Sequence, residues 1–121
     1  MGIQASINAV SIIDISTNKV TARINVGKSP YGLAVNPSGT KVYVANSGSN
    51  TVSVIDTSTN TVVATIGVGD HPIGLAVNPS GTRAYVANEN SDTVSVIDTS
   101  NNTIIDTIEV GEYQMAFGNF M

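Results

Sequence analysis

The 121-residue chain has no cysteine and no tryptophan, and only 12% of its residues are charged. Without cysteine it cannot form disulfide bonds, use a thiolate in catalysis or bind a metal through thiolates. Its five basic residues are scattered and form no concentrated stripe that could bind phosphate groups, so no nucleic-acid partner is expected. No apolar run is long enough to cross a membrane as a helix, so no membrane span is expected either.

Runs of good helix formers are also lacking, whereas Val, Thr, Ser, Asn and Gly are abundant. This composition predicts an all-β fold. The first ten residues contain neither the charged region nor the long apolar region of a signal peptide. Because the chain starts inside a repeat, we interpret it as a fragment of a longer protein or an excised piece.

A repeat of about 42 residues organises the chain. Residues 31–69 and 73–111 are identical at roughly 28 of 39 positions, and the period lies in the range of propeller blades. Residues 10–27 match 52–69, so half a unit precedes the two full units. The single repeat domain, 1–121, is therefore divided into an opening part-blade (1–27), a blade (28–69), a second blade (70–111) and a closing strand (112–121).

Each full unit contains four short runs rich in Val, Ile, Thr and Tyr and bounded by turn residues, and each run predicts a strand. Residues 1–6 align with 43–48, so they could form a degenerate strand or a leader. The predicted strands are 31–36, 40–46, 51–56 and 61–68 in the first full unit, and 73–78, 82–88, 93–98 and 103–110 in the second.

Turn residues recur at the same places in both units. Each unit has an Asn-Pro-Ser-Gly turn, in which Pro suits the second turn position and Gly supplies the positive φ that closes a hairpin. An Asp begins each connection between the third and fourth strands, where its carboxylate can accept turn N–H groups instead of serving in catalysis. These structural turn residues are Pro37, Gly39, Asp56, Pro79, Gly81 and Asp98.

The apolar residues of 52–55 and 84–87 do not alternate with charges, so both faces of each sheet are expected to be covered. Radial stacking covers both faces, and small residues such as Gly32 and Ala34 suit the crowded inner end of a blade. The sequence thus predicts four-stranded antiparallel β-propeller blades, about three per chain.

The tetrapeptide Tyr-Val-Ala-Asn occurs at 43–46 and 85–88, together with recurrent Gly-Leu-Ala-Val-Asn-Pro-Ser-Gly and Val-Ser-Val-Ile-Asp segments. In these motifs the chain resembles the YVTN β-propeller repeats of surface-layer and other secreted proteins, over nearly everything after Ile7. The resemblance implies an extracellular or cell-surface location. Residues 116–121 are similar to the final strand on which such propellers close, and the lack of Trp and of Gly-Gly pairs argues against WD-repeat and kelch blades.

Three units are too few to close a ring, because closed propellers need at least four blades. The opening part-blade and the closing strand are complementary. We therefore predict that two chains form a six-bladed ring, in which each closing strand completes the opening blade of the other chain. The expected partner of the chain is accordingly itself, as a homodimer.

The sequence contains no catalytic cluster. Its one histidine, His71, lies between two units where Ser29 and Tyr113 are the equivalent residues, and we interpret it as an ordinary loop residue. One histidine without cysteine supplies too few ligands for a transition metal unless symmetry brings copies together. The polar segment 88–92 lacks the spacing of a calcium-binding EF-hand and is interpreted as a solvated loop. No catalytic residue, metal or cofactor is predicted, because phosphate-binding, nucleophile-elbow and dinucleotide motifs are all missing.

Three functions remain open. The favoured one is a non-catalytic structural or recognition module that binds protein or carbohydrate at the cell surface through loops on one rim. The second is a fragment of a propeller enzyme, such as a lactonase or a dehydrogenase, which the apolar inner strands and the single histidine disfavour. The third is a truncated or engineered self-assembling fragment without activity of its own. The predicted rim contacts are Lys28, Tyr31, Asn46, Ser47, Asp70, His71, Asn88, Glu89, Asp92, Glu112 and Tyr113.

Overall fold

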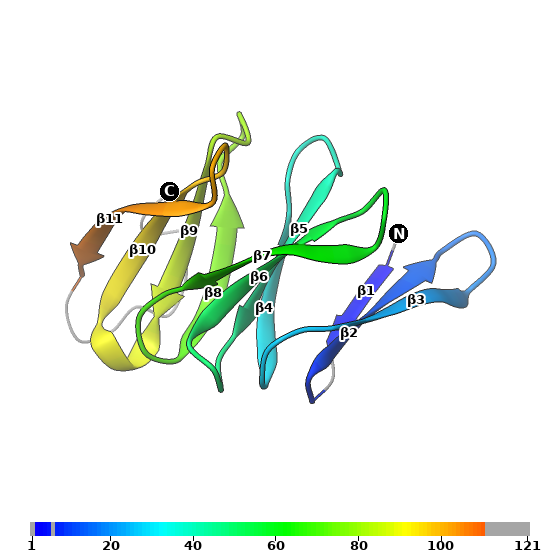
Figure 1. The fold of residues 1–121 in the computed structure, drawn as a ribbon, viewed down its shortest axis with the longest axis horizontal. Helices are drawn as coiled ribbons and strands as arrows, with labels where there is room; N and C mark the ends of the chain where they lie inside the picture. Colours follow the sequence, from blue (N-terminus) through cyan, green and yellow to red (C-terminus); the bar gives the residue numbers. More distant parts are fainter. Residues whose placement is uncertain (1, 6, 111–121) are drawn as a thin grey trace.

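The structure, a computed structural model, describes residues 2–5 and 7–110. The strands are β1 (Gly2–Ala5), β2 (Ala9–Asp14), β3 (Lys19–Asn25), β4 (Pro30–Val35), β5 (Lys41–Asn46), β6 (Thr51–Asp56), β7 (Thr61–Gly67), β8 (Pro72–Val77), β9 (Arg83–Asn88), β10 (Thr93–Asp98) and β11 (Thr103–Glu109), with the short 3-10 helix η1 (Glu89–Ser91) after β9. They form three sheets, β1–β3, β4–β7 and β8–β11, which follow one another across the molecule in chain order (Figure 1).

The predicted all-β fold of propeller blades is confirmed. The second and third sheets are complete four-stranded antiparallel blades, and the first is a blade of three strands in which β1 pairs with β2 as β5 pairs with β6. No described residue occupies the place beside β1 that β4 occupies beside β5. The predicted closing strand, 112–121, lies outside the described residues and stays a prediction, as does the six-bladed ring.

The last two strands of each sheet, β2–β3, β6–β7 and β10–β11, pair with the same irregularity. The register shifts between Ile12 and Ile13 in the first sheet, between Val54 and Ile55 in the second, and between Val96 and Ile97 in the third. A β-bulge of this kind bends the strand and increases its twist. The repeat therefore reproduces backbone detail as well as strand order.

The Asn-Pro-Ser-Gly segments close the β4–β5 and β8–β9 hairpins. Gly39 and Gly81 have φ values of 73° and 75°, a region that glycine enters without a steric penalty. In the first turn the Gly39 N–H donates to the Asn36 carbonyl at 2.9 Å. The Asn36 Oδ1 atom accepts the N–H groups of Thr40 and Lys41 at 2.9 and 3.0 Å. One asparagine side chain and one glycine backbone thus close the hairpin.

Apolar contacts between neighbouring sheets form the core. We call the side of a sheet that faces the next sheet in the chain its forward face, and the opposite side its backward face. At the first interface Val10, Ile12 and Ile24 of the forward face pack on Val42, Val44 and Ile55 of the backward face. At the second interface Tyr43, Ala45, Val52, Val54 and Ile66 pack on Leu75, Ala84, Val86 and Ile97. Both interfaces use equivalent positions of the repeat, so one packing arrangement occurs twice.

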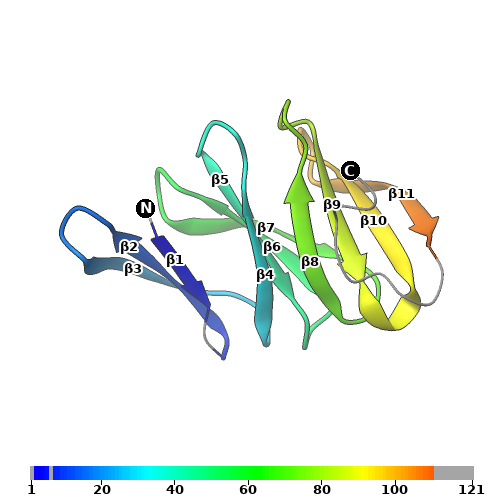
Figure 2. The ribbon, with the colours of Figure 1, turned by 180° about the vertical axis from the view of Figure 1, so that it is seen from behind.

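The innermost strands of the two complete blades approach each other closely, and Figure 2 shows β4 and β8 side by side. A Cβ atom at Gly32 of β4 would lie 2.3 Å from the backbone oxygen of Ile73 in β8. Glycine is therefore required at this point of contact between the blades.

Replacing Gly39 with valine is expected to lower the free energy of unfolding by roughly 1–2 kcal/mol or more, because a β-branched residue is strained at positive φ. A Cβ atom at Gly39 would meet no atom within 4 Å, so backbone strain alone would cause the loss. The same direction is expected for Gly81→Val. Urea unfolding of each variant measures the effect.

The matched control is Gly67→Val in β7. A Cβ atom at Gly67 also meets nothing within 4 Å, and its φ is not in the positive region. This variant should unfold at the same urea concentration as the wild type or slightly above it. Equal losses in the Gly39 and Gly67 variants would contradict the role assigned to the positive φ.

Candidate functional site

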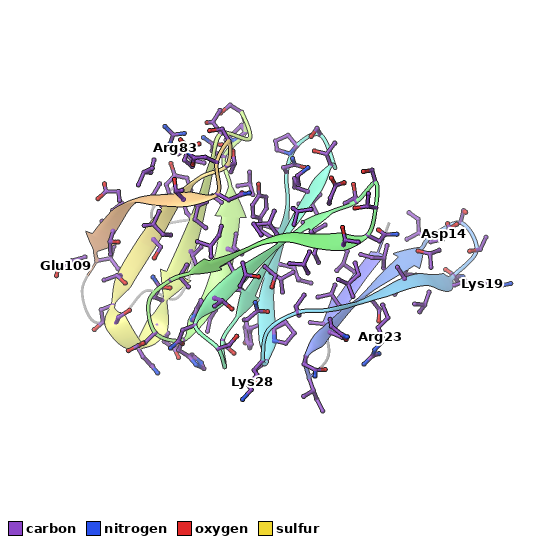
Figure 3. All side chains as sticks on the ribbon, in the orientation of Figure 1. Asp14, Lys19, Arg23, Lys28, Arg83 and Glu109 are labelled. Atoms are coloured by element: carbon purple, nitrogen blue, oxygen red, sulfur yellow. The ribbon has the colours of Figure 1, made fainter. Side chains whose placement is uncertain are left out.

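The connections between sheets gather on one edge of the molecule, which we call the loop rim. It is marked by Lys28 in Figure 3 and also carries the turns β1–β2, β5–β6 and β9–β10. Arg83 lies at the opposite edge, the turn rim, which carries the remaining hairpin turns of each sheet. Functional groups of a rigid scaffold are found disproportionately on such connecting loops. The loop rim comprises residues 7–8, 26–29, 47–50, 68–71 and 89–92.

Backbone hydrogen bonds join the loop-rim segments to one another. The Ser29 N–H donates to the Ile7 carbonyl at 2.8 Å, and the Ser47 N–H donates to the Ser29 carbonyl at 3.0 Å, so one connection bridges the loops of two sheets. One unit later the Glu89 N–H donates to the His71 carbonyl at 3.0 Å. Hydrogen bonds thus join the backbones of neighbouring loop-rim segments.

Several non-glycine residues of the loop rim have a left-handed backbone. The φ values are 52° for Ser29, 58° for Asn50, 56° for His71 and 51° for Asp92. Such conformations cost free energy in residues with a Cβ atom and are found preferentially at functional sites. Ser29 and His71 are equivalent in the repeat, so the connection between blades keeps this conformation whichever residue it carries.

The side chain of His71 is paired with an acid. Its Nε2 atom lies 3.6 Å from Oε1 of Glu89, and the two side chains are 42% and 46% exposed. The His71 N–H donates to Oδ1 of Asn50 at 2.9 Å, and Nδ2 of Asn50 donates to Oδ1 of Asp70 at 3.3 Å. These contacts bring together polar groups from the loop rim of two successive blades, with the imidazole held beside a carboxylate.

Asn46 and Asn88, which were predicted as rim contacts, are fully buried at the ends of β5 and β9. The Nδ2 atom of Asn46 donates to Oγ of Ser53 at 2.9 Å and to Oγ1 of Thr51 at 3.1 Å. Its Oδ1 atom is also buried and accepts no hydrogen bond from the described residues. In the same way, the Nδ2 atom of Asn88 donates hydrogen bonds to the hydroxyls of Ser95 and Thr93.

The structure separates the other predicted contacts by exposure. Tyr31, at the start of β4, is 72% exposed, whereas Ser47 is buried and its hydroxyl donates to the Ser29 carbonyl at 2.8 Å. Glu112 and Tyr113 lie outside the described residues. On the loop rim, Lys28, Asp70 and Glu89 are exposed, and His71 and Asp92 are partly exposed.

The hydroxyl groups that accept hydrogen bonds from Asn46 and Asn88 were not predicted from the sequence. Asparagine is followed by threonine five residues later and by serine seven residues later in both full units, and this repeated spacing was the available signal. Thr51 and Ser53, the hydroxyl residues beside Asn46, border a pocket of about 410 Å³ between the first and second sheets. Its lining residues are Asn25, Val26, Gly27, Ser49, Thr51, Ser53, Val62 and Thr65.

A second pocket, of about 310 Å³, opens between the same two sheets and is lined in part by Asp14, Thr57 and Asn60 of the turn rim. Within residues 2–5 and 7–110 no three His, Cys, Asp or Glu side chains are grouped so that they could hold a metal ion. No helix in this part of the chain is long and apolar enough to cross a membrane.

The turn rim carries one aspartate per sheet. The Oδ1 atom of Asp56 accepts the hydroxyl of Ser58 at 2.6 Å and its N–H at 2.8 Å, and these two hydrogen bonds are the main reason that the pKa of Asp56 lies below its usual value. The Nζ atom of Lys41, 3.5 Å from Asp56, lowers the pKa further. Asp14 and Asp98 have lowered pKa values for the same main reason, hydrogen bonds from the serine two residues later.

Comparison with known proteins shows what this chain is similar to. The family described as lactonase, 7-bladed β-propeller, matches residues 5–106. A hydrazine synthase from Kuenenia stuttgartiensis has a similar structure, with a TM-score of 0.85 and 35% identity over 88% of this chain and 31% of that chain. No curated protein matches the chain significantly.

Two further solved structures share the fold. The dihydro-heme d1 dehydrogenase NirN, in complex with DHE, has a TM-score of 0.76 and 24% identity over 84% of this chain and 22% of its own. Apo AztD from Citrobacter koseri has a TM-score of 0.73 and 17% identity over 85% of this chain and 29% of its own. The chain spans less than a third of the length of each of these three structures.

The expectation that the chain is not part of an enzyme is therefore wrong. The family that matches it is a lactonase family, and the hydrazine synthase that it resembles at 35% identity is also an enzyme. The expectation rested on the absence of a catalytic cluster from the sequence, but catalytic groups of one site can come from distant elements of a fold. The comparisons support propeller blades and give no support to the surface-layer assignment.

The lowered pKa values of the turn-rim aspartates predict that the fold loses stability in acid. A carboxylate whose pKa is lower in the folded state stabilises the fold above its unfolded-state pKa, and this contribution is lost as the pH falls through the folded-state pKa. Changing Asp14, Asp56 and Asp98 together to Asn should lower the urea midpoint at pH 7 and flatten its decline below about pH 4.

The control is Asp106→Asn, on the outer strand β11, which should keep the decline of the wild type. Urea midpoints measured between neutral and acidic pH compare the two variants. A triple variant that declines in acid as steeply as this control would show that the aspartate–serine hydrogen bonds do not cause the acid sensitivity.

Proposed function

Because the chain belongs to the lactonase family of seven-bladed β-propellers, we propose that it supplies blades of a propeller enzyme that hydrolyses a lactone. The match to this family over residues 5–106 is the observation that carries the proposal. The activity is that of a ring larger than the sheets described, because the chain contributes two complete blades and one of three strands.

Hydrolysis of a lactone, a cyclic ester, opens its ring with one water molecule. The water oxygen bonds to the carbonyl carbon, the bond between that carbon and the ring oxygen breaks, and a proton from water ends on the ring oxygen. The product is a hydroxy acid. The reaction needs a group that takes a proton from the attacking water and returns it to the leaving oxygen, and histidine suits both tasks near neutral pH.

His71 is the residue of this chain best placed for that role. It lies on the exposed loop rim, its backbone is held by the hydrogen bond to Asn50, and its imidazole lies 3.6 Å from the Glu89 carboxylate. A carboxylate beside a histidine orients the ring and stabilises its charged form during proton transfer. We propose His71 as the general base and Glu89 as the residue that positions it.

The predictions of a cell-surface location, and of protein or carbohydrate bound by the rim loops, remain proposals beside this one. Exposed Tyr31 and Lys28 would serve a carbohydrate ligand on the loop rim, with the aromatic ring providing a flat apolar surface and the ammonium group a hydrogen-bond donor.

Lactonase activity is tested by incubating the complete propeller ring that contains these blades with a panel of five- and six-membered lactones and following acid release with a pH indicator. His71→Ala should reduce the rate by about 10²-fold or more, the range expected when a general base is removed. Glu89→Gln should reduce it less, because the imidazole stays. Asp106→Asn, which removes a carboxylate from β11, is the control and should match the wild type.

Two results would count against these assignments. Failure of the complete ring to hydrolyse any lactone of the panel would contradict the proposed activity. Hydrolysis that is unchanged in His71→Ala would contradict the role of His71 while leaving the activity in place.

A further inference from the structure

The pocket of about 410 Å³ between the first and second sheets is lined by hydroxyl groups on the side of the second sheet. Ser49, Thr51, Ser53 and Thr65 supply these groups, and we call them the hydroxyl wall. Thr65 pairs with Ser53, and Ser53 pairs with Val44, which belongs to the apolar cluster of the same interface. Residues paired across antiparallel strands lie on the same face of a sheet, so Ser53 and Thr65 face the first sheet.

Hydrogen bonds within the protein use only part of the capacity of the hydroxyl wall. Oγ of Ser49 accepts the N–H of Lys28 at 3.2 Å and lies 3.1 Å from Oγ1 of Thr51, so one of these two hydroxyls donates to the other. Ser53 is 2% exposed and accepts a hydrogen bond from Nδ2 of Asn46 at 2.9 Å, but its own hydrogen is donated to no described residue. A hydroxyl group can donate one hydrogen bond and accept two, so the wall still offers both donors and acceptors.

The opposite wall is the segment in which the first sheet leads into β4. Residues 25–27 line the pocket from this side. A Cβ atom at Gly27 would clash with Oγ of Ser49, so glycine allows this segment to pass close to the hydroxyl wall. Val26 and Val62 add apolar surface, and none of the lining residues is charged.

We propose that this pocket binds a neutral polyhydroxylated ring, the chemistry shared by monosaccharide units and cyclitols. The hydroxyl groups of such a ligand both donate and accept hydrogen bonds, as those of the wall do. Its C–H groups pack against Val26 and Val62. A charged ligand is disfavoured, because its charge would be desolvated without a partner among the lining residues. The volume of about 410 Å³ lies within the range of small-molecule sites, about 300–1,000 Å³.

The second interface provides matched positions for a test. The hydroxyl wall recurs there one unit later as Ser91, Thr93, Ser95 and Thr107. Ser95 is 3% exposed and, like Ser53, accepts a hydrogen bond of 2.9 Å from the buried asparagine of its own sheet. Ile104 stands in the place of Val62. The fold therefore accommodates isoleucine at this position of the repeat.

The test titrates the complete propeller ring that contains these blades with four probes, the methyl glycosides of glucose, galactose and mannose, and myo-inositol. NMR resonances of the methyl groups of Val26 and Val62 report binding in this pocket. At least one probe should shift them with a dissociation constant on the order of 1 mM, as expected for a ligand of about a dozen non-hydrogen atoms. Cyclohexanol, a ring of similar size with a single hydroxyl, should bind at least about tenfold more weakly.

Ser53→Ala should weaken binding about tenfold or more, because it removes the buried hydroxyl donor. Ser95→Ala is the matched control. It loses the same internal hydrogen bond at the second interface, so it should change the urea midpoint equally and leave the titration unchanged. Val62→Ile should also weaken binding, because it adds a methylene group to the pocket, and the resonances of Val26 report the titration in this variant.

The proposal is overturned if no probe shifts the resonances of Val26 and Val62, because the pocket would then hold water only. It is also overturned if Ser53→Ala and Ser95→Ala weaken binding equally, because binding would then follow the stability of the blades. Both remaining outcomes support it: tighter binding of myo-inositol indicates a free cyclitol, and tighter binding of a glycoside indicates the end of a glycan. The test measures binding instead of turnover, so it can fail separately from the proposed lactone hydrolysis.

Discussion

Apolar packing of one sheet on the next is the interaction on which the rest of this structure depends. The middle sheet buries Val44 and Ile55 on one side and Val54 and Ile66 on the other. A sheet with apolar residues on both faces cannot be stable alone, because both faces would remain in water. Each blade therefore needs neighbours, and the stability of the array comes from interfaces between adjacent units.

The position of the loop rim follows from the same packing. A Cβ atom at Gly27 would lie 2.8 Å from the side chain of Asn46, and one at Gly69 would lie 2.9 Å from that of Asn88. Each connection between blades thus passes directly over a buried asparagine of the next blade, which hydrogen bonds to hydroxyls of its own sheet. This close passage places His71 on the rim and brings it next to Glu89.

The packing of the blades leaves the side chains of the loop rim free to vary. Strand and turn positions recur between units, whereas the loop rim has Ser29 in one unit and His71 in the next at the same left-handed position. A scaffold that holds the backbone of a loop independently of its side chain allows polar groups to change from blade to blade. His71, which we propose as the general base, occupies one of these positions.

The sequence by itself determined the repeat, the strands and the hairpin turns, because strand propensity and the chemistry of Asn-Pro-Ser-Gly act over a few residues. The tertiary structure decided which side chains are buried and which loops meet. Asn46 was predicted on the surface, yet it is buried, and Glu89 pairs with His71 across 18 residues of sequence. Ile66 and Ile108 have equivalent places in the repeat but are 6% and 42% exposed. Burial depends on whether another sheet packs against a residue, and no local pattern records that.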